Sequence, residues 1–237
     1  GFIAHWDTRL SQLVVHGATQ FPHVVRTGLA EFLQIPEIQI RVISPDIGGG
    51  FGYKAVVTGE EICLCWLAMR CGHPVRWLED RREQLIANAN CREHHYDMTA
   101  FTDEKGKILA FDAKAVVDSG AYSAYPFTAA IEASQVSAIL PGPYDLPAYR
   151  CSAVAVATNK TPQLPYRGVA RPGCCYAMEV MVDALAREIG MEPYEVRLAN
   201  LVGPEQMPYD NITDKHFDSG DYPELLRRTV AAIDLPS

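Results

Sequence analysis

The feature that most constrains the fold is an irregular succession of strand and helix signals along the chain. Two short apolar runs, residues 2–6 and 12–16, flank a polar turn and predict a β-hairpin. Pro22 stands where a helical pattern begins, and the clearest helix spans residues 172–189 and is stopped by Gly190. Because strands and helices do not alternate as regular βαβ units, the pattern predicts an α+β fold of mixed sheets with packed helices.

The remaining elements follow from the same periodicities and breakers. We expect strands at 38–43, 74–77 and 149–157, a long hairpin at 94–117 with its turn at 103–106, and helices at 58–70, 127–140 and from 192 and 222 onward.

Composition excludes several classes of partner. A net charge of −8 over 237 residues disfavours binding to nucleic acid, which depends on neutralising phosphates. The longest apolar run, residues 62–69, is far shorter than the ~20 residues that span a bilayer, so we expect no membrane partner. Seven cysteines without a C-x-x-C pair indicate reduced thiols and a cytoplasmic location. The chain begins without methionine, which suggests a piece of a longer polypeptide.

A run of glycines at residues 48–52 (GGGFG) follows the strand expected at 38–43. Glycines permit left-handed backbone conformations and let backbone N–H groups approach a ligand closely. The loop fits neither a Walker A loop nor a dinucleotide fingerprint, because Tyr53 and Ala55 replace residues that those templates need. Two interpretations stay open: a ligand-binding loop, or a tight turn between a strand and a helix.

A second candidate loop, residues 166–171, carries Arg167 and Arg171 on either side of the flexible Gly168 and runs into the helix start at Pro172. A helix N-terminus exposes unpaired N–H groups and a partial positive charge, which suit an anion or an oxo ligand. The alternative is that both arginines are surface charges paired with the acidic excess of the chain.

His94, His95 and Asp97 suggest metal ligands by their proximity in sequence. Adjacent histidines on a strand face opposite sides, so we favour surface or core histidines instead. A hydrolase that uses cysteine or histidine is a further alternative, although no G-x-S-x-G segment supports it. Cys174 lies at a helix start, which would stabilise a thiolate, but packing is the commoner role for such a cysteine.

Six segments in one order cover nearly the whole chain. They are residues 17–23 (GATQFPH), 46–54 (DIGGGFGYK), 74–83 (PVRWLEDRRE), 158–162 (TNKTP), 166–172 (YRGVARP) and 192–200 (EPYEVRLAN). Together they resemble the molybdenum-cofactor subunit of the xanthine dehydrogenase, aldehyde oxidase and carbon monoxide dehydrogenase family of molybdenum hydroxylases. Each motif alone is weak, and their number and order make the resemblance specific.

The resemblance implies that residues 1–237 are the first half of a molybdopterin-binding domain, a fragment of a longer subunit whose C-terminal half is missing. It implies catalytic roles for Gln20, which would hydrogen-bond an oxo ligand of molybdenum, and for Arg167, which would lie beside the metal and the substrate. No side chain of this chain would ligate the metal itself. Cofactor contacts are implied for Gly49, Gly50, Phe51, Gly52 and Gly168, with Phe51 presenting its backbone N–H.

By the same resemblance, the protein would oxidise an aldehyde or an N-heteroaromatic carbon with water as the oxygen source. The cofactor would be molybdenum–molybdopterin in a dinucleotide form. Electrons would pass to 2Fe-2S clusters and FAD on partner chains or domains. The implied partners are these iron–sulfur and FAD units, the remaining half of the same subunit and a small-molecule substrate.

Departures from the family narrow these implications. Purine-oxidising members carry a glutamate and a phenylalanine where this chain has Ala55 and Val169, so these two positions would line a pocket that suits xanthine poorly. Carbon monoxide enzymes place a cysteine shortly after the loop arginine, where this chain has Gly168 and Val169. The family's catalytic glutamate stands in a later G-x-G-E segment that this chain lacks, and neither Glu132 nor Glu179 stands in such a motif. We therefore expect the fragment alone to be inactive, and a non-catalytic scaffold or subunit-contact domain with an empty cofactor site is the alternative.

Overall fold

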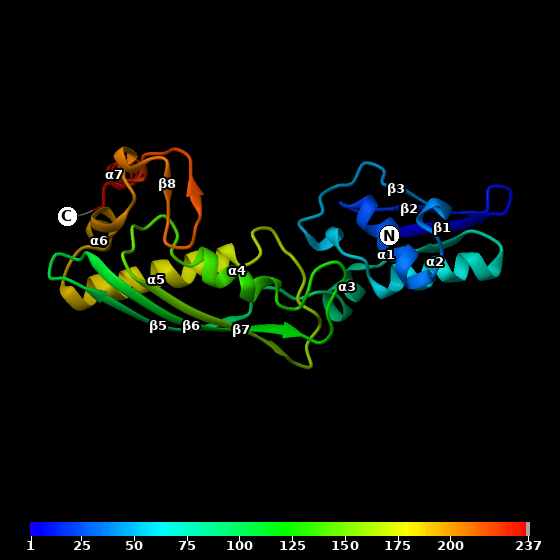
Figure 1. Ribbon diagram of the computed structural model, residues 1–237, viewed down its shortest axis with the longest axis horizontal. Coiled ribbons are helices and arrows are strands. Elements are labelled where there is room, and N and C mark those ends of the chain that lie inside the picture. Colours follow the sequence, from blue (N-terminus) through cyan, green and yellow to red (C-terminus); the bar gives the residue numbers. More distant parts are fainter. Residues whose placement is uncertain (236–237) are drawn as a thin grey trace. The chain divides into compact units, whose positions relative to one another are not determined.

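The computed structural model describes residues 1–235 and divides them into two compact units. Unit 1 comprises Gly1–Cys91, Asp118–Ile131 and Val156–Val169. Unit 2 comprises Arg92–Val117, Glu132–Ala155 and the described residues from Ala170 onward. Both units contain helices and strands (Figure 1), which confirms the predicted α+β class with mixed sheets.

A four-stranded sheet in the order β3-β2-β1-β4 forms the centre of unit 1. Strand β1 pairs antiparallel with both β2 and β4, whereas β2 pairs parallel with β3. The bounds are β1 Phe2–Asp7, β2 Gln12–Gly17, β3 Ile40–Ile43 and β4 Val75–Trp77, and the helices are α1 Pro22–Leu33, α2 Gly59–Cys71 and α3 Arg81–Ala87, with 3-10 turns η1 Glu37–Gln39 and η2 Tyr53–Ala55.

The helices of unit 1 begin and end where local chemistry dictates. Pro22 occupies the first turn of α1, where its missing N–H costs nothing. At the start of α2, the backbone N–H of Thr58 donates to Glu61 Oε2 at 3.1 Å, and Gly72 ends the helix with a φ of 68°. Alternate residues of the hairpin face inward, and Ala4 among them is fully buried between the sheet and the helices.

Unit 2 is built mainly on a three-stranded sheet in the order β5-β6-β7, with β5 and β6 antiparallel. Helix α5 packs against the sheet at β5 and against α6. The bounds are β5 His94–Thr102, β6 Ile108–Gly120, β7 Tyr149–Ala157, α4 Ile131–Ile139, α5 Arg171–Ile189, α6 Pro193–Asn200, the 3-10 turn η3 Pro204–Gln206, β8 Tyr209–Asp210, β9 His216–Phe217 and α7 Tyr222–Ala232.

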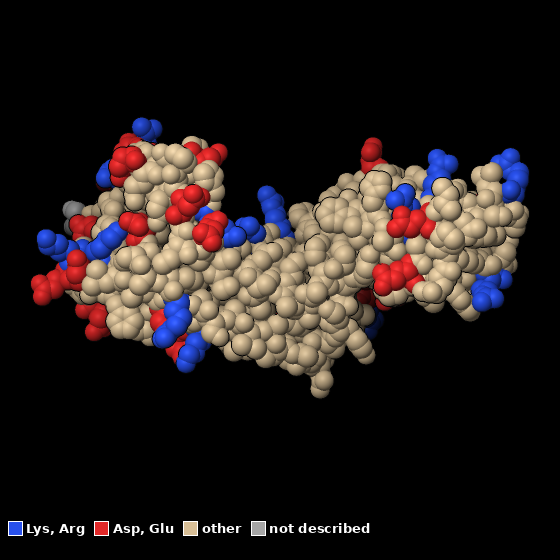
Figure 2. Space-filling view, in the orientation of Figure 1, with Lys and Arg blue, Asp and Glu red and all other residues tan. Residues whose placement is uncertain are grey.

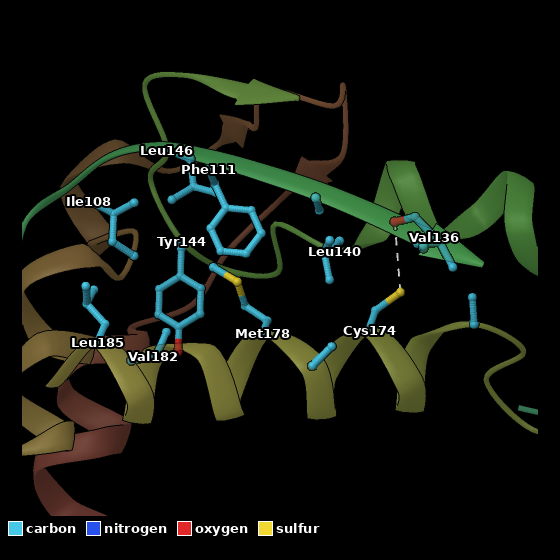
Figure 3. Close-up of a cluster of buried hydrophobic side chains, with 14 of the residues drawn as sticks. Ile108, Phe111, Val136, Leu140, Tyr144, Leu146, Cys174, Met178, Val182 and Leu185 are labelled. Atoms are coloured by element: carbon cyan, nitrogen blue, oxygen red, sulfur yellow. Dashed lines mark hydrogen bonds between the residues drawn. The ribbon is translucent and has the colours of Figure 1, made fainter. Parts of the chain in front are cut away.

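One face of α5 supplies much of the core of unit 2. Figure 3 shows Met178 and Val182 of this helix directed toward Phe111 and Tyr144, and all four side chains are buried. The thiol of Cys174, one turn earlier, donates a weak hydrogen bond to the carbonyl of Val136, with a sulfur–oxygen distance of 3.9 Å. The helical period of the 172–189 segment therefore did identify a core-facing helix.

The expected helix over 127–140 begins only at Ile131, so its first four residues were predicted wrongly. Serine side chains form hydrogen bonds with the backbone N–H and carbonyl of Ala129, which a helical turn would otherwise use. The N–H of Ala129 donates to Ser123 Oγ at 2.8 Å, and its carbonyl accepts from Ser119 Oγ at 2.7 Å. Serine hydroxyls that bond nearby backbone compete with helix formation in this way.

The surface charges, the cysteines and the helix lengths can each be compared with the sequence expectations. Basic and acidic side chains are interspersed on the face shown in Figure 2. All seven cysteines are free thiols. Within residues 1–235, no helix has the length and the apolar character that crossing a bilayer requires.

Candidate functional site

The glycine-rich loop after β3 is held in conformations that favour glycine. Gly49 and Gly52 have φ angles of 90° and 92°, and Phe51 between them has a φ of 55°. A Cβ on Gly52 would lie 2.6 Å from the carbonyl oxygen of Pro165, so this position also requires glycine for close approach of another backbone segment. The loop is therefore a surface formed largely by backbone atoms, and its residue Phe51 is 53% exposed.

Gln20 lies against this loop. Its Oε1 accepts a hydrogen bond from the backbone N–H of Gly52 at 2.9 Å, and a Cβ on Gly50 would lie 2.5 Å from the same side chain. The backbone N–H of Gln20 also donates to the carbonyl of Lys54 at 2.8 Å. Because an N–H group can only donate, the contact with Gly52 fixes which end of the side-chain amide faces the loop, and Nε2 faces away from that contact.

The second loop meets the first. The backbone N–H of Arg167 donates to the carbonyl of Phe51 at 2.9 Å, and the rings of Phe51 and Tyr166 stack with centroids 6.0 Å apart and an interplanar angle of 16°. Gly168 and Val169 both have positive φ angles, 95° and 53°. A β-branched residue in the left-handed region is strained, which is a feature that clusters at functional sites.

The structure thus brings together the predicted residues of three segments in unit 1: Gln20, the 48–52 loop and the 166–169 loop. Ala55 lies just beyond the first loop, where its side chain is buried. Arg171 is placed differently, because it begins α5 in unit 2 and donates to Gln135 at 3.4 Å.

Several hydrogen-bond donors of this site have no acceptor within the described residues. Among residues 1–235, the structure pairs neither the backbone N–H groups of Gly49, Gly50 and Phe51 nor the Nε2 group of Gln20. Unpaired N–H groups around a glycine-rich loop form a concave arrangement that suits an anion or an electronegative oxygen. The residues therefore fit a cofactor that presents oxygen atoms to the loop.

A cavity of about 620 Å³ adjoins the glycine-rich loop on the side of α3. Its walls include the loop from Gly48 to Phe51, together with Lys54, Arg81, Asn88 and Tyr166. Sequence reasoning missed α3 and the part it takes in this wall. The available signal was the capping box at its start, where Asp80 Oδ1 accepts from the N–H of Glu83 at 2.7 Å.

His94 is a buried core histidine and not part of this site. Its Nε2 lies 2.6 Å from Glu132 Oε2, its Nδ1 lies 2.8 Å from the hydroxyl of Tyr96, and the His94 and Glu132 side chains are 2% and 0% exposed. His95 faces the opposite side of β5 and is exposed, as strand geometry requires. Within the described part of the chain, no three His, Cys, Asp or Glu side chains form a group that could hold a metal ion.

Cys174 is buried, and Glu179 is held by neighbouring side chains. Burial raises the pKa of the Cys174 thiol to about 11, so the thiol stays protonated at neutral pH and is a poor nucleophile. Glu179 accepts from the hydroxyl of Tyr144 at 2.8 Å and pairs with Arg197 Nε at 2.7 Å. This chemistry provides no support for a cysteine hydrolase, nor for Glu179 as a catalytic base.

Comparison with known proteins places these motifs in a family. A family model described as "Molybdopterin cofactor-binding domain" matches residues 1–201. The carbon monoxide dehydrogenase large chain of Hydrogenophaga pseudoflava is 36% identical over 100% of this chain and 30% of its own length. The nicotine 6-hydroxylase large subunit of Paenarthrobacter nicotinovorans is 34% identical over 100% of this chain and 29% of its own length.

Comparison with solved structures finds a protein of similar fold and similar sequence identity. The crystal structure of quinoline 2-oxidoreductase from Pseudomonas putida 86 superposes with a TM-score of 0.93 at 36% identity, over 98% of this chain and 30% of that one. The chain thus spans about 30% of the length of these relatives. The chain belongs to the molybdopterin cofactor-binding domain family of the molybdenum hydroxylases.

Proposed function

We propose that this chain forms part of the catalytic site of a molybdenum hydroxylase that oxidises an aldehyde or an N-heteroaromatic carbon, with water as the oxygen source. The observation that carries the proposal is the meeting of Gln20, the glycine-rich loop and the Arg167 loop in one place. The names of two relatives, nicotine 6-hydroxylase and quinoline 2-oxidoreductase, state action on N-heteroaromatic compounds, which supports this substrate class.

When bound, the molybdenum–molybdopterin group supplies a two-electron redox centre. The chain's own part is to hold it through donors: Gln20 Nε2 and the backbone N–H groups of Gly50 and Phe51 would hydrogen-bond its oxygen atoms. Such donors are already oriented before the reaction begins, so they stabilise developing negative charge without reorganisation. Gly49, Gly52 and Gly168 would keep the backbone close enough for these contacts.

Arg167 would act beside the cofactor and the substrate. Its backbone is fixed by the 2.9 Å hydrogen bond to Phe51, and its side chain is exposed at the surface of unit 1. A guanidinium in that position can orient a substrate and stabilise negative charge that develops on it.

Ala55 and Val169 would bound the substrate pocket. Neither side chain offers a carboxylate or an aromatic ring, so a purine would lose polar recognition and stacking at these two positions. An aldehyde or a small heteroaromatic ring needs neither, which favours these substrate classes over xanthine.

The proposal also covers the extent of the domain, the form of the cofactor, the electron acceptors and the location. We take residues 1–237, of which the last two lie outside the described residues, as one part of a molybdopterin-binding domain in a longer subunit. The cofactor would be the dinucleotide form, the electron acceptors would be 2Fe-2S and FAD units on partner chains or domains, and the location would be the cytoplasm. This chain alone would be inactive, because its sequence lacks the family's G-x-G-E segment.

The decisive experiment measures molybdenum by elemental analysis and pterin by fluorescence after denaturation, in the complete protein purified from its own host. Both should be present, and Gln20→Ala should reduce turnover of an aromatic aldehyde at least about tenfold while leaving the unfolding midpoint nearly unchanged. Gln12→Ala is the matched control, because its amide makes a single 3.4 Å contact to Ile38 away from the loop. Absence of both molybdenum and pterin would favour the scaffold alternative.

A further inference from the structure

The cavity beside the glycine-rich loop has an unusual distribution of charge. The chain carries 29 acidic and 21 basic residues, yet none of the residues that line this cavity is aspartate or glutamate. Two of the lining residues, Lys54 and Arg81, are cationic. A cationic wall without carboxylates in an acidic protein is a local exception to the overall charge, and it favours a negatively charged occupant.

Three carboxylates line an adjoining cavity of about 250 Å³. Lys54 and Arg81 line both cavities, whereas Glu61, Glu79 and Asp80 line only the adjoining one. None of these three carboxylates comes within ion-pairing distance of Lys54 or Arg81.

Each of the three carboxylates has another partner. Glu61 accepts from the N–H of Thr58 at 3.1 Å, Asp80 from the N–H of Glu83 at 2.7 Å, and Glu79 from Asn88 Nδ2 at 2.6 Å. Among residues 1–235, Lys54 has no ion pair, and the polar contact of the Arg81 side chain is to the neutral amide of Gln84. Both cations are therefore available to a ligand in the larger cavity.

The neutral groups around these cations add donors and a flat surface. Burial raises the pKa of Tyr53 to about 12, so its phenol stays uncharged at neutral pH. Phe51 and Tyr166, which also line the cavity, are stacked on each other and partly exposed. A planar group can rest against such a surface while an oxyanion on it meets the cations.

We propose that this cavity binds the oxyanion group, a carboxylate or a phosphate, of a ligand that reaches the glycine-rich loop, with Lys54 and Arg81 as its cationic contacts. The ligand's identity rests on the proposed function. A carboxylate would belong to an aromatic substrate, and a phosphate would belong to the cofactor. The binding of an oxyanion itself depends only on the charges and the cavity.

The test measures binding by titration calorimetry at low ionic strength, with the complete protein in cofactor-loaded and cofactor-free forms. The probes are benzoate, its neutral analogue benzamide, and inorganic pyrophosphate. We expect at least one anion to bind, with benzoate about tenfold tighter than benzamide if the source is a carboxylate. Added salt should weaken the binding of the anion and leave benzamide unaffected.

Neighbouring arginines provide the matched variants. Arg81→Gln should weaken anion binding about fivefold, because it removes a cation from the cavity wall. Arg82→Gln makes the same change of charge one residue along, outside the cavity, and should change binding less than about twofold. Lys54→Gln should resemble Arg81→Gln, since the Lys54 contacts to Gln20 and Thr19 use its backbone carbonyl, which the substitution keeps.

The outcomes separate the two sources and the two proposals. Benzoate binding to the loaded protein supports a substrate carboxylate, and pyrophosphate binding to the cofactor-free form alone supports the cofactor phosphate. If neither anion binds better than benzamide, or if the two arginine variants lose affinity equally, the inference is wrong. If the complete protein purified from its own host holds neither molybdenum nor pterin and still binds an anion, the proposed function is wrong and the cavity assignment stays intact.

Discussion

Gly173 in the first turn of α5 lies directly against His94 on β5. A Cβ at Gly173 would lie 2.7 Å from His94 Nδ1, closer than real Cβ atoms approach other atoms, and 3.1 Å from the neighbouring ring carbon. The glycine is therefore required by a buried ring and not by its backbone angle, because its φ is not positive. This contact joins the start of the helix to the buried His94–Glu132 pair.

Gly173→Ala should destabilise the protein by about 1–3 kcal/mol, because the added methyl group must displace a buried ring. The higher helix propensity of alanine would otherwise favour the variant by about 1 kcal/mol. Gly59→Ala is the matched control, since a Cβ there meets nothing within 4 Å. Urea unfolding of both variants checks this, and the prediction is wrong if the two show the same gain in stability.

The His94–Glu132 pair should be costly to break. Replacing His94 with alanine removes the 2.6 Å partner of a carboxylate that is 0% exposed, which predicts a loss on the order of 3 kcal/mol. His95→Ala, on the exposed side of the same strand, should change the free energy of unfolding by less than about 0.5 kcal/mol. Thermal unfolding midpoints of the two variants measure the difference, and similar midpoints would argue that the pair contributes little.

Glu61 should make stability depend on pH near neutrality. Burial raises its pKa from 4.5 to about 7, so the folded protein holds this proton more tightly than the unfolded chain does. Between pH 4.5 and 7 the folded state therefore binds more protons, and stability falls as the pH rises through this window.

Glu61→Gln should remove this slope. The variant should gain stability relative to the wild type, by on the order of 2 kcal/mol, when the comparison moves from pH 5 to pH 8. The gain will be reduced by the loss of the charge on the bond to the Thr58 N–H. Glu60→Gln, its exposed neighbour, serves as the control, and equal slopes for the two variants in urea unfolding at both pH values would rule out the assignment.

The ends of helices were predictable where a single residue type favours starting or stopping a helix. Pro22, Thr58 and Gly72 mark ends that the structure reproduces, since capping and φ preference act within one turn of chain. The start of α4 was not predictable, because its preceding backbone bonds to the hydroxyls of Ser119 and Ser123, and the first of these lies ten residues away from its partner in sequence.

The candidate site also has features that the sequence predicted and features that it could not predict. The glycine run and the Arg167 loop could be recognised as candidates from residue types alone, since glycine and a helix start imply accessible N–H groups. Their hydrogen bond, from the Arg167 N–H to the Phe51 carbonyl, joins segments far apart in the chain, and no local pattern specifies such a pair. Arg171 shows the converse. It shares a sequence motif with Arg167 of unit 1, yet it belongs to unit 2, where it contacts Gln135.

By itself the sequence determined the type of most elements, the family and which short segments could present donors, because each of these follows from short stretches of neighbouring residues. Only the tertiary structure decided that Gln20 caps the Gly52 N–H, that His94 is sealed against Glu132, and that Lys54 and Arg81 share a cavity without carboxylates. The reason is physical: hydrogen bonds and burial depend on distances in space, and distant segments reach them only once the sheets and helices have packed.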